Sequence, residues 1–311
     1  MKVLLPVDGS SYSDMATDMV KALRLPSQTE VIVITVVPEH TFLGGITLGK
    51  LRGVSAKKEA QQQKALELLQ QSIQALSATK FKVDSLVRWG NPAEEILKVA
   101  DERGISLIVM GAKGLTDPLA FHIGSVALAV MKHAKTSVLL VRQTARITNQ
   151  VSRAKKKAVT INRILIATDG SKYSDMVTRF LLDLPLRRHC EVIVVTALQS
   201  YLAALIKMPT LDFQTNQELL VRLQATEESE ALKLTAKSEK EFNARGYKTS
   251  CVVLKGGAAE SILAAAKRYE PDIIALGSRG LSEIESRLLG SVAERVASHT
   301  DCSVLIGRAS K

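Results

Sequence analysis

The chain of 311 residues contains two similar halves, and this repetition limits its fold more than any other feature. Two early segments match at an offset of 161 residues: VLLPVDGSSYSDMAT (3–17) with ILIATDGSKYSDMVT (164–178), and EVIVITVV (30–37) with EVIVVTAL (191–198). Three later segments match at an offset of 166 residues: GNPAEEI (90–96) with GGAAESI (256–262), IVMGAKGL (108–115) with IALGSRGL (274–281), and IGSVALAVM (123–131) with LGSVAERVA (289–297). Because order and spacing persist, we infer a tandem duplication. It places domain 1 at 1–145, a basic linker at 146–159 and domain 2 at 160–311.

Composition is typical of a soluble globular protein, with 46% hydrophobic and 23% charged residues. No apolar run approaches the roughly 18–20 residues that span a bilayer. The N-terminal run MKVLLPVDGSS is soon interrupted by Asp8 and Gly9, so it predicts a first strand and not a signal peptide. We therefore expect a cytoplasmic protein. Cys190, Cys251 and Cys302 form no metal or disulfide pattern, which predicts buried, reduced thiols on strands.

The formal net charge of +11 is partly local. Residues 143–162 carry Arg146, Arg153 and the run 155–157 of lysines, and no acid. A solvated linker is the simplest interpretation, and contact with a nucleic acid or a membrane surface is the alternative. Because no aromatic residue interleaves for base stacking, we expect no specific nucleic-acid site.

Each half alternates apolar strands with helices. In the first half, strands are expected at 3–7, 31–37, 81–88, 105–110 and 137–141, a loop at 38–52, and helices at 12–24, 54–78, 92–103 and 124–134. Asn91 and Pro92 favour a helix start there, as N-cap and first helical residue. Such alternation predicts an α/β fold, with a mostly parallel five-stranded sheet covered by helices on both faces of each domain. Ligands bind such sheets at the carboxyl ends of the strands, where the strand order reverses.

A glycine pattern, G-x2-G-x9-G-S, leads from an apolar strand into a helix in each half. Its members are Gly111, Gly114, Gly124 and Ser125 in the first half, and Gly277, Gly280, Gly290 and Ser291 in the second. Glycines let the backbone approach a ligand with no Cβ in the way. Free N–H groups at a helix start favour an anion. The spacing differs from that of a Walker A loop and of the dinucleotide fingerprint. The pattern predicts a phosphate cradle; a purely structural turn is the alternative.

Asp8 and Asp169 follow the first strand of each half, at the same edge of the sheet as the glycines. An acid in this place can accept a hydrogen bond from a ribose hydroxyl or hold a magnesium ion. The alternative role is that of N-cap for the helix that follows.

The segments PVDGS, VIVITVV, GNPAEEI and TSVLLVR, in order around the glycine pattern, resemble the universal stress protein family. The resemblance covers nearly all of both halves, with 38–80 and 199–246 less constrained. G-x2-G-x9-G-[S/T] marks the ATP-binding subclass of that family. The resemblance therefore implies two tandem Rossmann-like domains of the adenine nucleotide alpha hydrolase-like group. Each would be competent to bind ATP or another adenine nucleotide, with Mg²⁺ left open.

The resemblance also assigns site residues by position. In domain 1 the adenosine side is Pro6, Val7, Asp8 and the backbone of Val36, and the ribose and phosphates meet Met110, Gly111, Gly114, Gly124, Ser125 and Val126. In domain 2 the equivalents are Ala167, Thr168, Asp169, Ala197, Leu276, Gly277, Gly280, Gly290, Ser291 and Val292. Domain 2 is the closer match, with Arg279 and Arg287 near its turn. In domain 1 the spacer holds Asp117 and Pro118, and an inward carboxylate there would repel phosphate.

Family members commonly dimerise through their last strands, so 136–142 and 302–308 could pair within the chain as a pseudo-dimer; a homodimer stays open. The five histidines show no HExxH motif and no triad order, so we expect at most slow ATP hydrolysis. The expected function is that of an ATP-binding stress-response sensor or switch that acts on an unknown protein partner. The alternatives are a slow ATPase or nucleotidyl-transfer enzyme, and a chaperone-like scaffold with vestigial sites.

Overall fold

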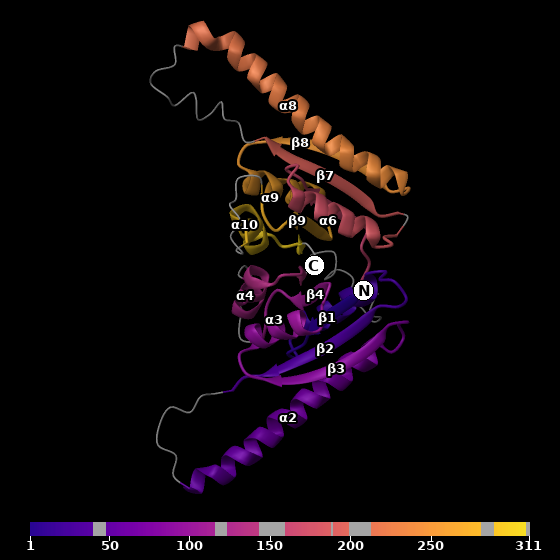
Figure 1. Cartoon of the computed structure of the whole chain (residues 1–311), viewed down its shortest axis with the longest axis vertical. Helices are drawn as coiled ribbons and strands as arrows, with labels where there is room; N and C mark the ends of the chain where they lie inside the picture. Colours follow the sequence, from indigo (N-terminus) through magenta and orange to yellow (C-terminus); the bar gives the residue numbers. More distant parts are fainter. Residues whose placement is uncertain are drawn as a thin grey trace. The chain divides into compact units, whose positions relative to one another are not determined.

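The computed structural model describes residues 1–39, 48–115, 123–142, 159–187, 189–198, 213–280 and 289–308. The chain divides into two compact units: unit 1 is Met1–Thr160 with Ala309–Lys311, and unit 2 is Ile161–Arg308 (Figure 1). The expected linker lies outside the described residues except for residue 159. The expected pairing of the two final strands stays a prediction.

Unit 1 forms a parallel sheet with its strands in the order β3-β2-β1-β4-β5. Its elements are β1 (Lys2–Pro6), α1 (Ser11–Ala22), β2 (Glu30–Val37), α2 (Leu48–Leu76), β3 (Lys82–Trp89), α3 (Pro92–Glu102), β4 (Leu107–Gly111), α4 (Ser125–His133) and β5 (Ser137–Val141). The strand order reverses between β1 and β4, and this reversal is the usual ligand position in an open α/β sheet.

Unit 2 repeats this topology, with parallel strands in the order β8-β7-β6-β9-β10. Its elements are β6 (Arg163–Ala167), α6 (Lys172–Asp183), β7 (Glu191–Leu198), α8 (Phe213–Ala244), β8 (Lys248–Lys255), α9 (Ala258–Tyr269), β9 (Ile273–Gly277), α10 (Ser291–His299) and β10 (Ser303–Gly307). The reversal here falls between β6 and β9. The predicted α/β fold with a parallel sheet is confirmed.

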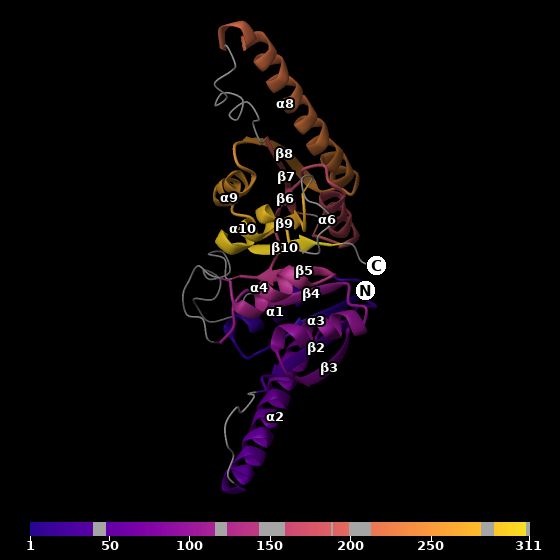
Figure 2. The ribbon, with the colours of Figure 1, turned by 60° about the vertical axis from the view of Figure 1, so that its left-hand side comes forward.

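Helices cover both faces of each sheet. In unit 1, α1 packs against α2, and α3 packs against α4. Right-handed crossovers place the first pair on one face and the second pair on the other. Figures 1 and 2 both show the long helices α2 and α8 beside the sheets, where α2 contacts β2 and β3, and α8 contacts β7 and β8. Among the described helices, none is long and apolar enough to cross a bilayer.

The central strand β1 shows why these residues fold in this way. Val3, Leu4 and Leu5 are fully buried, because helices cover the strand on both sides. A continuous aliphatic run fits this place, whereas an alternating pattern would bury polar side chains.

The helix α2 begins earlier than its sequence predicts. It starts at Leu48, so the end of the loop expected at 38–52 is helical, and residues 40–47 lie outside the described part. Gly49 and Gly53 favoured a later start, since glycine costs a helix about 1 kcal/mol relative to alanine. A helix of 29 residues with many good helix formers tolerates this cost.

The three cysteines are free thiols, but only Cys190 is buried, and only Cys251, which is half-buried, lies on a strand. Cys190 is buried just before β7, and Cys302 is half-buried just before β10. Burial, helped by Asp272 and Glu191, raises the pKa of Cys190 to about 12. Burial also raises the pKa of Cys251 to about 11.

We expect Cys190 to resist alkylation in the folded protein at pH 8. The thiolate is the reactive form, and a pKa of about 12 leaves only about one thiolate in ten thousand at this pH. As long as the pH stays below the pKa, the thiolate fraction increases about tenfold for each unit by which the pH is raised. Alkylation should therefore be faster at pH 10 than at pH 8. Peptide mass spectrometry after timed iodoacetamide treatment measures the rate, with urea-unfolded protein as the control. Equal rates in folded and unfolded protein would contradict the expectation.

Candidate functional site

The carboxyl ends of β1 and β4 meet at the point where the strand order of unit 1 reverses. After β1 the chain continues through Val7, whose N–H donates to Ile34 O at 2.9 Å. Thr35 Oγ1 donates to Val7 O at 3.1 Å. These two bonds join the loop after β1 to β2, so the residue that follows, Asp8, has a defined position at the sheet edge.

Asp8 has one carboxylate oxygen in the loop and the other at the glycine turn. Its Oδ1 accepts from Ser10 N at 3.0 Å. Ser10 is the N-cap of α1, because its Oγ accepts from Ser13 N at 3.2 Å. The alternative role of Asp8 as the helix cap is therefore wrong. A Cβ on Gly114 would lie 2.9 Å from Asp8 Oδ2, so this second oxygen is next to the glycine turn.

The glycines of the turn have different physical roles. A Cβ on Gly111 would lie 2.7 Å from Tyr12 Cβ and 2.9 Å from the Tyr12 carbonyl carbon, so this glycine lets α1 pack against the end of β4. Among the described residues, the atom that a Cβ on Gly114 would meet within 4 Å is Asp8 Oδ2. Gly111 therefore serves the fold, whereas Gly114 leaves space beside a carboxylate.

The start of α4 has no side-chain cap. Gly124 is its N-cap, and the Gly124 N–H donates to Ala112 O at 2.8 Å, which closes the turn. By contrast, Ser10 caps α1 and Asn91 caps α3 through their side chains. The first-turn N–H groups of α4 and the positive end of its dipole thus favour an anion at this end of the helix.

These groups line one cavity of unit 1, with a volume of about 600 Å³. All the residues predicted for domain 1 line it: Pro6, Val7, Asp8, Val36, Met110, Gly111, Gly114, Gly124, Ser125 and Val126. The cavity reaches α2 at Gln61, Lys64 and Leu68. A volume of this size falls within the range of about 300–1,000 Å³ that is usual for small-molecule sites.

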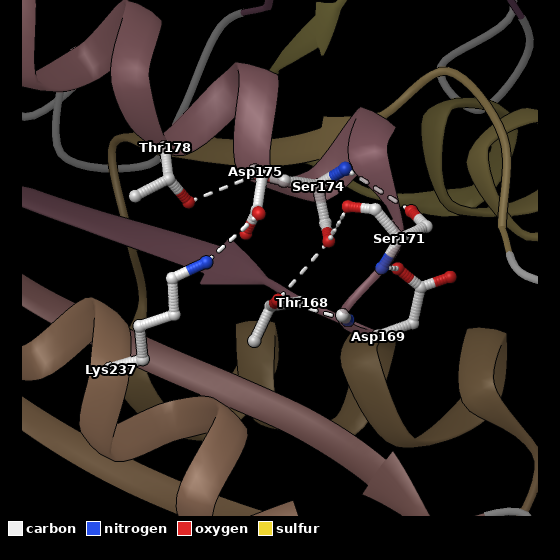
Figure 3. A network of polar contacts seen from close by, with 8 residues as sticks. Thr168, Asp169, Ser171, Ser174, Asp175, Thr178 and Lys237 are labelled. Atoms are coloured by element: carbon white, nitrogen blue, oxygen red, sulfur yellow. Dashed lines mark hydrogen bonds and ion pairs between the residues drawn. The ribbon is translucent and has the colours of Figure 1, made fainter.

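Unit 2 fixes the equivalent loop with more polar contacts (Figure 3). Thr168 Oγ1 donates to Ser174 Oγ at 3.2 Å, and Asp169 Oδ1 accepts from Ser171 N at 3.0 Å. Unit 1 has Val7 at the position of Thr168, so its loop lacks the threonine hydroxyl. Figure 3 also shows Lys237 of α8 paired with Asp175 of α6 at 2.9 Å, which joins the two helices beside this loop.

The cavity of unit 2 is smaller, with a volume of about 130 Å³. All the residues predicted for domain 2 line it: Ala167, Thr168, Asp169, Ala197, Leu276, Gly277, Gly280, Gly290, Ser291 and Val292. A Cβ on Gly280 would lie 2.9 Å from Asp169 Oδ2, as in unit 1, and α10 also begins without a side-chain cap. The two units therefore share the same groups around cavities of unequal volume.

The model of the universal stress protein family matches residues 1–142 and 160–308. The chain belongs to the universal stress protein family. The two matched segments also confirm that it has a tandem, two-domain architecture.

Several relatives of this universal stress protein are known. Universal stress protein MJ0577 of Methanocaldococcus jannaschii is 29% identical over 153 residues, which are 46% of this chain and 94% of the relative. The crystal structure of a universal stress protein from Archaeoglobus fulgidus covers 100% of this chain and 97% of its own, with a TM-score of 0.63 and 20% identity. A universal stress protein solved in complex with cAMP is 21% identical, covers 49% of this chain and 98% of its own, and has a TM-score of 0.30.

Two features of the universal stress protein site were missed in the sequence. Gln61 and Lys64 of α2 line the cavity. No sequence motif predicts this, because the packing of the helix decides which of its side chains face the cavity. Lys113 also lines it, and here a signal existed: both halves have a basic residue before the second glycine of the pattern, with Arg279 in unit 2. The spacer residues Asp117, Pro118 and Arg287 lie outside the described residues.

Proposed function

We propose that this universal stress protein binds an adenine nucleotide, ATP in the first place, in the unit 1 cavity, and that occupancy switches its interaction with a partner protein. The proposal rests on one observation about the cavity of unit 1. The Asp8 carboxylate, the open position at Gly114 and the uncapped start of α4 line a single cavity of about 600 Å³.

Each part of the nucleotide has a suitable group in this cavity. Asp8 can accept a hydrogen bond from a ribose hydroxyl. Val7, Val36 and Met110 offer apolar surface to the base. The first-turn N–H groups of α4 can bind phosphate. A Mg²⁺ ion would be shared between Asp8 and the phosphates, since Mg²⁺ in nucleotide sites is usually held by one or two carboxylates together with substrate phosphates.

The site in unit 2 is proposed to be weaker. It has the same acid and the same uncapped helix, but its cavity of about 130 Å³ is below the usual range for small-molecule ligands. A nucleotide would have to widen this cavity on binding, and that rearrangement costs free energy.

Isothermal titration calorimetry of the full chain with MgATP tests the binding proposal. We expect one tight site per chain, with any second site at least about tenfold weaker, because a rearrangement of only about 1.4 kcal/mol has this effect. GTP and adenosine are the comparison ligands, and the release of phosphate from MgATP is followed in parallel. If neither ATP nor adenosine binds, the proposal is overturned. Rapid release of phosphate from MgATP would indicate an ATPase and contradict the proposed switch.

The switch itself requires a change that depends on the nucleotide. Hydrogen exchange with and without MgATP should show slower exchange at the start of α4 and in the loop after β1, because a bound anion would occupy their N–H groups. Slower exchange confined to unit 2 would contradict the proposed site.

A further inference from the structure

Lys113 is an unusual cation in the unit 1 cavity. Only 4% of the residue is exposed, although lysine is almost never fully buried without a partner. It lies inside the glycine turn, between Gly111 and Gly114, and lines the cavity. Across the described parts of the chain, no hydrogen bond or ion pair of its ammonium group is found. A cation that lines the cavity beside an uncapped helix start is suited to an anionic ligand.

Unit 2 has a different arrangement at the same position. Arg279 Nη1 donates to Tyr173 Oη at 3.0 Å, and the guanidinium carbon lies 5.3 Å from the centroid of the Tyr173 ring. The guanidinium group is therefore engaged by a hydrogen bond and by the face of an aromatic ring. Tyr12 is the residue of unit 1 that corresponds to Tyr173. Within the described residues, no contact between Tyr12 and Lys113 is found that would match the one between Tyr173 and Arg279.

We propose that Lys113 binds the phosphates of the nucleotide in unit 1, whereas Arg279 is retained by Tyr173 and does not do so in unit 2. This inference rests on the proposed function and adds the residue that recognises the charged end of the ligand. The ammonium group of Lys113 and the N–H groups of α4 would bind the phosphates together. Both donate charge-assisted or dipole-assisted hydrogen bonds, which are stronger than bonds between neutral groups.

A comparison of ATP with adenosine tests the role of Lys113, because only ATP carries the phosphates. In the full chain, Lys113→Met should raise the Kd for ATP about 10- to 100-fold, the range expected for a lost hydrogen bond to a charged group. The Kd for adenosine should change by less than about twofold, which also shows that the cavity is still folded. Lys113→Arg keeps the charge at a position where unit 2 already has arginine, so it should restore most of the ATP affinity.

Arg279→Met is the matched control, and it should leave the tight ATP site unchanged. Tyr173→Phe removes the hydroxyl but keeps the ring that faces Arg279, and it should likewise leave the tight ATP site unchanged. Equal losses of ATP and adenosine affinity in Lys113→Met, or no loss of either, would overturn the role of Lys113. Failure of the unsubstituted chain to bind ATP or adenosine would overturn the proposed function and this inference with it.

Discussion

Gly114→Val should raise the Kd of unit 1 for ATP more than about 100-fold and leave the fold intact. A Cβ at this position would already lie 2.9 Å from Asp8 Oδ2, and the branched side chain of valine extends further into the cavity. The carboxylate would be displaced from the place where it can meet a ribose, and the approach of a phosphate to α4 would be blocked. Gly114 has no positive φ, so the backbone itself accepts a larger residue.

The same substitution in unit 2 is the control. Gly280→Val places a Cβ equally close, 2.9 Å, to Asp169 Oδ2, and it should leave the tight ATP site unchanged. Calorimetry gives the Kd of each variant, and circular dichroism with thermal unfolding checks the fold. Normal ATP binding by both variants would mean that the phosphates do not lie at these turns.

Phe242→Ala should lower the free energy of unfolding of unit 2 by about 3–5 kcal/mol, the usual cost of deleting a buried aromatic ring. Phe242 is fully buried near the end of α8, and its ring meets that of Tyr247 edge to face, with centroids 6.1 Å apart. The lost ring would leave a cavity between α8 and the sheet, because neighbouring side chains collapse only in part.

Unit 1 suggests the conservative control for this experiment. A Cβ on Gly9 would meet Leu68 of α2, and a Cβ on Gly170 would meet Leu234 of α8, so these two leucines hold equivalent positions. Eight residues further along, α2 has Leu76 and α8 has Phe242, which are therefore equivalent as well. Phe242→Leu copies unit 1 and should cost less than about 1.5 kcal/mol.

Urea unfolding can be followed separately in the two units. Trp89 is the one tryptophan of the sequence and lies in unit 1, so its fluorescence should show an unchanged transition in Phe242→Ala. The far-ultraviolet circular dichroism reports both units and should show an earlier loss of structure. An unchanged circular dichroism transition would contradict the predicted role of Phe242.

The sequence predicts the fold well because each local signal agrees with the next. Buried aliphatic strands of five to eight residues alternate with amphipathic helices, and Asn91 with Pro92 indicates the start of α3, where the structure has it. The start of α2 was wrong, since glycine propensities are weak beside the packing of a long helix. The alternative role of Asp8 as the cap of α1 is wrong, because aspartate and serine cap about equally well and only the geometry selects Ser10.

The residues of the candidate site could be predicted from the sequence, but the volumes of the two cavities could not. Both groups of predicted residues gather around cavities, since they end strands that meet at the same edge of a parallel sheet. The cavity of about 600 Å³ extends to Gln61, Lys64 and Leu68 of α2, whereas no described residue of α8 lines the cavity of about 130 Å³. Motif spacing contains no information on cavity volume, so the sequence favours domain 2 as the closer match to the family, whereas the larger cavity lies in unit 1.

The different roles of Gly111 and Gly114 bear on how the two halves of a duplicated protein can diverge. Gly111 is required by the contact of α1 with β4, so a larger residue there would damage the whole unit. Gly114 is required only by the empty space beside Asp8, and a single nucleotide change in its codon can produce valine. One half of such a protein could thus lose the proposed nucleotide site in one mutational step and continue to fold, while the other half keeps its own site.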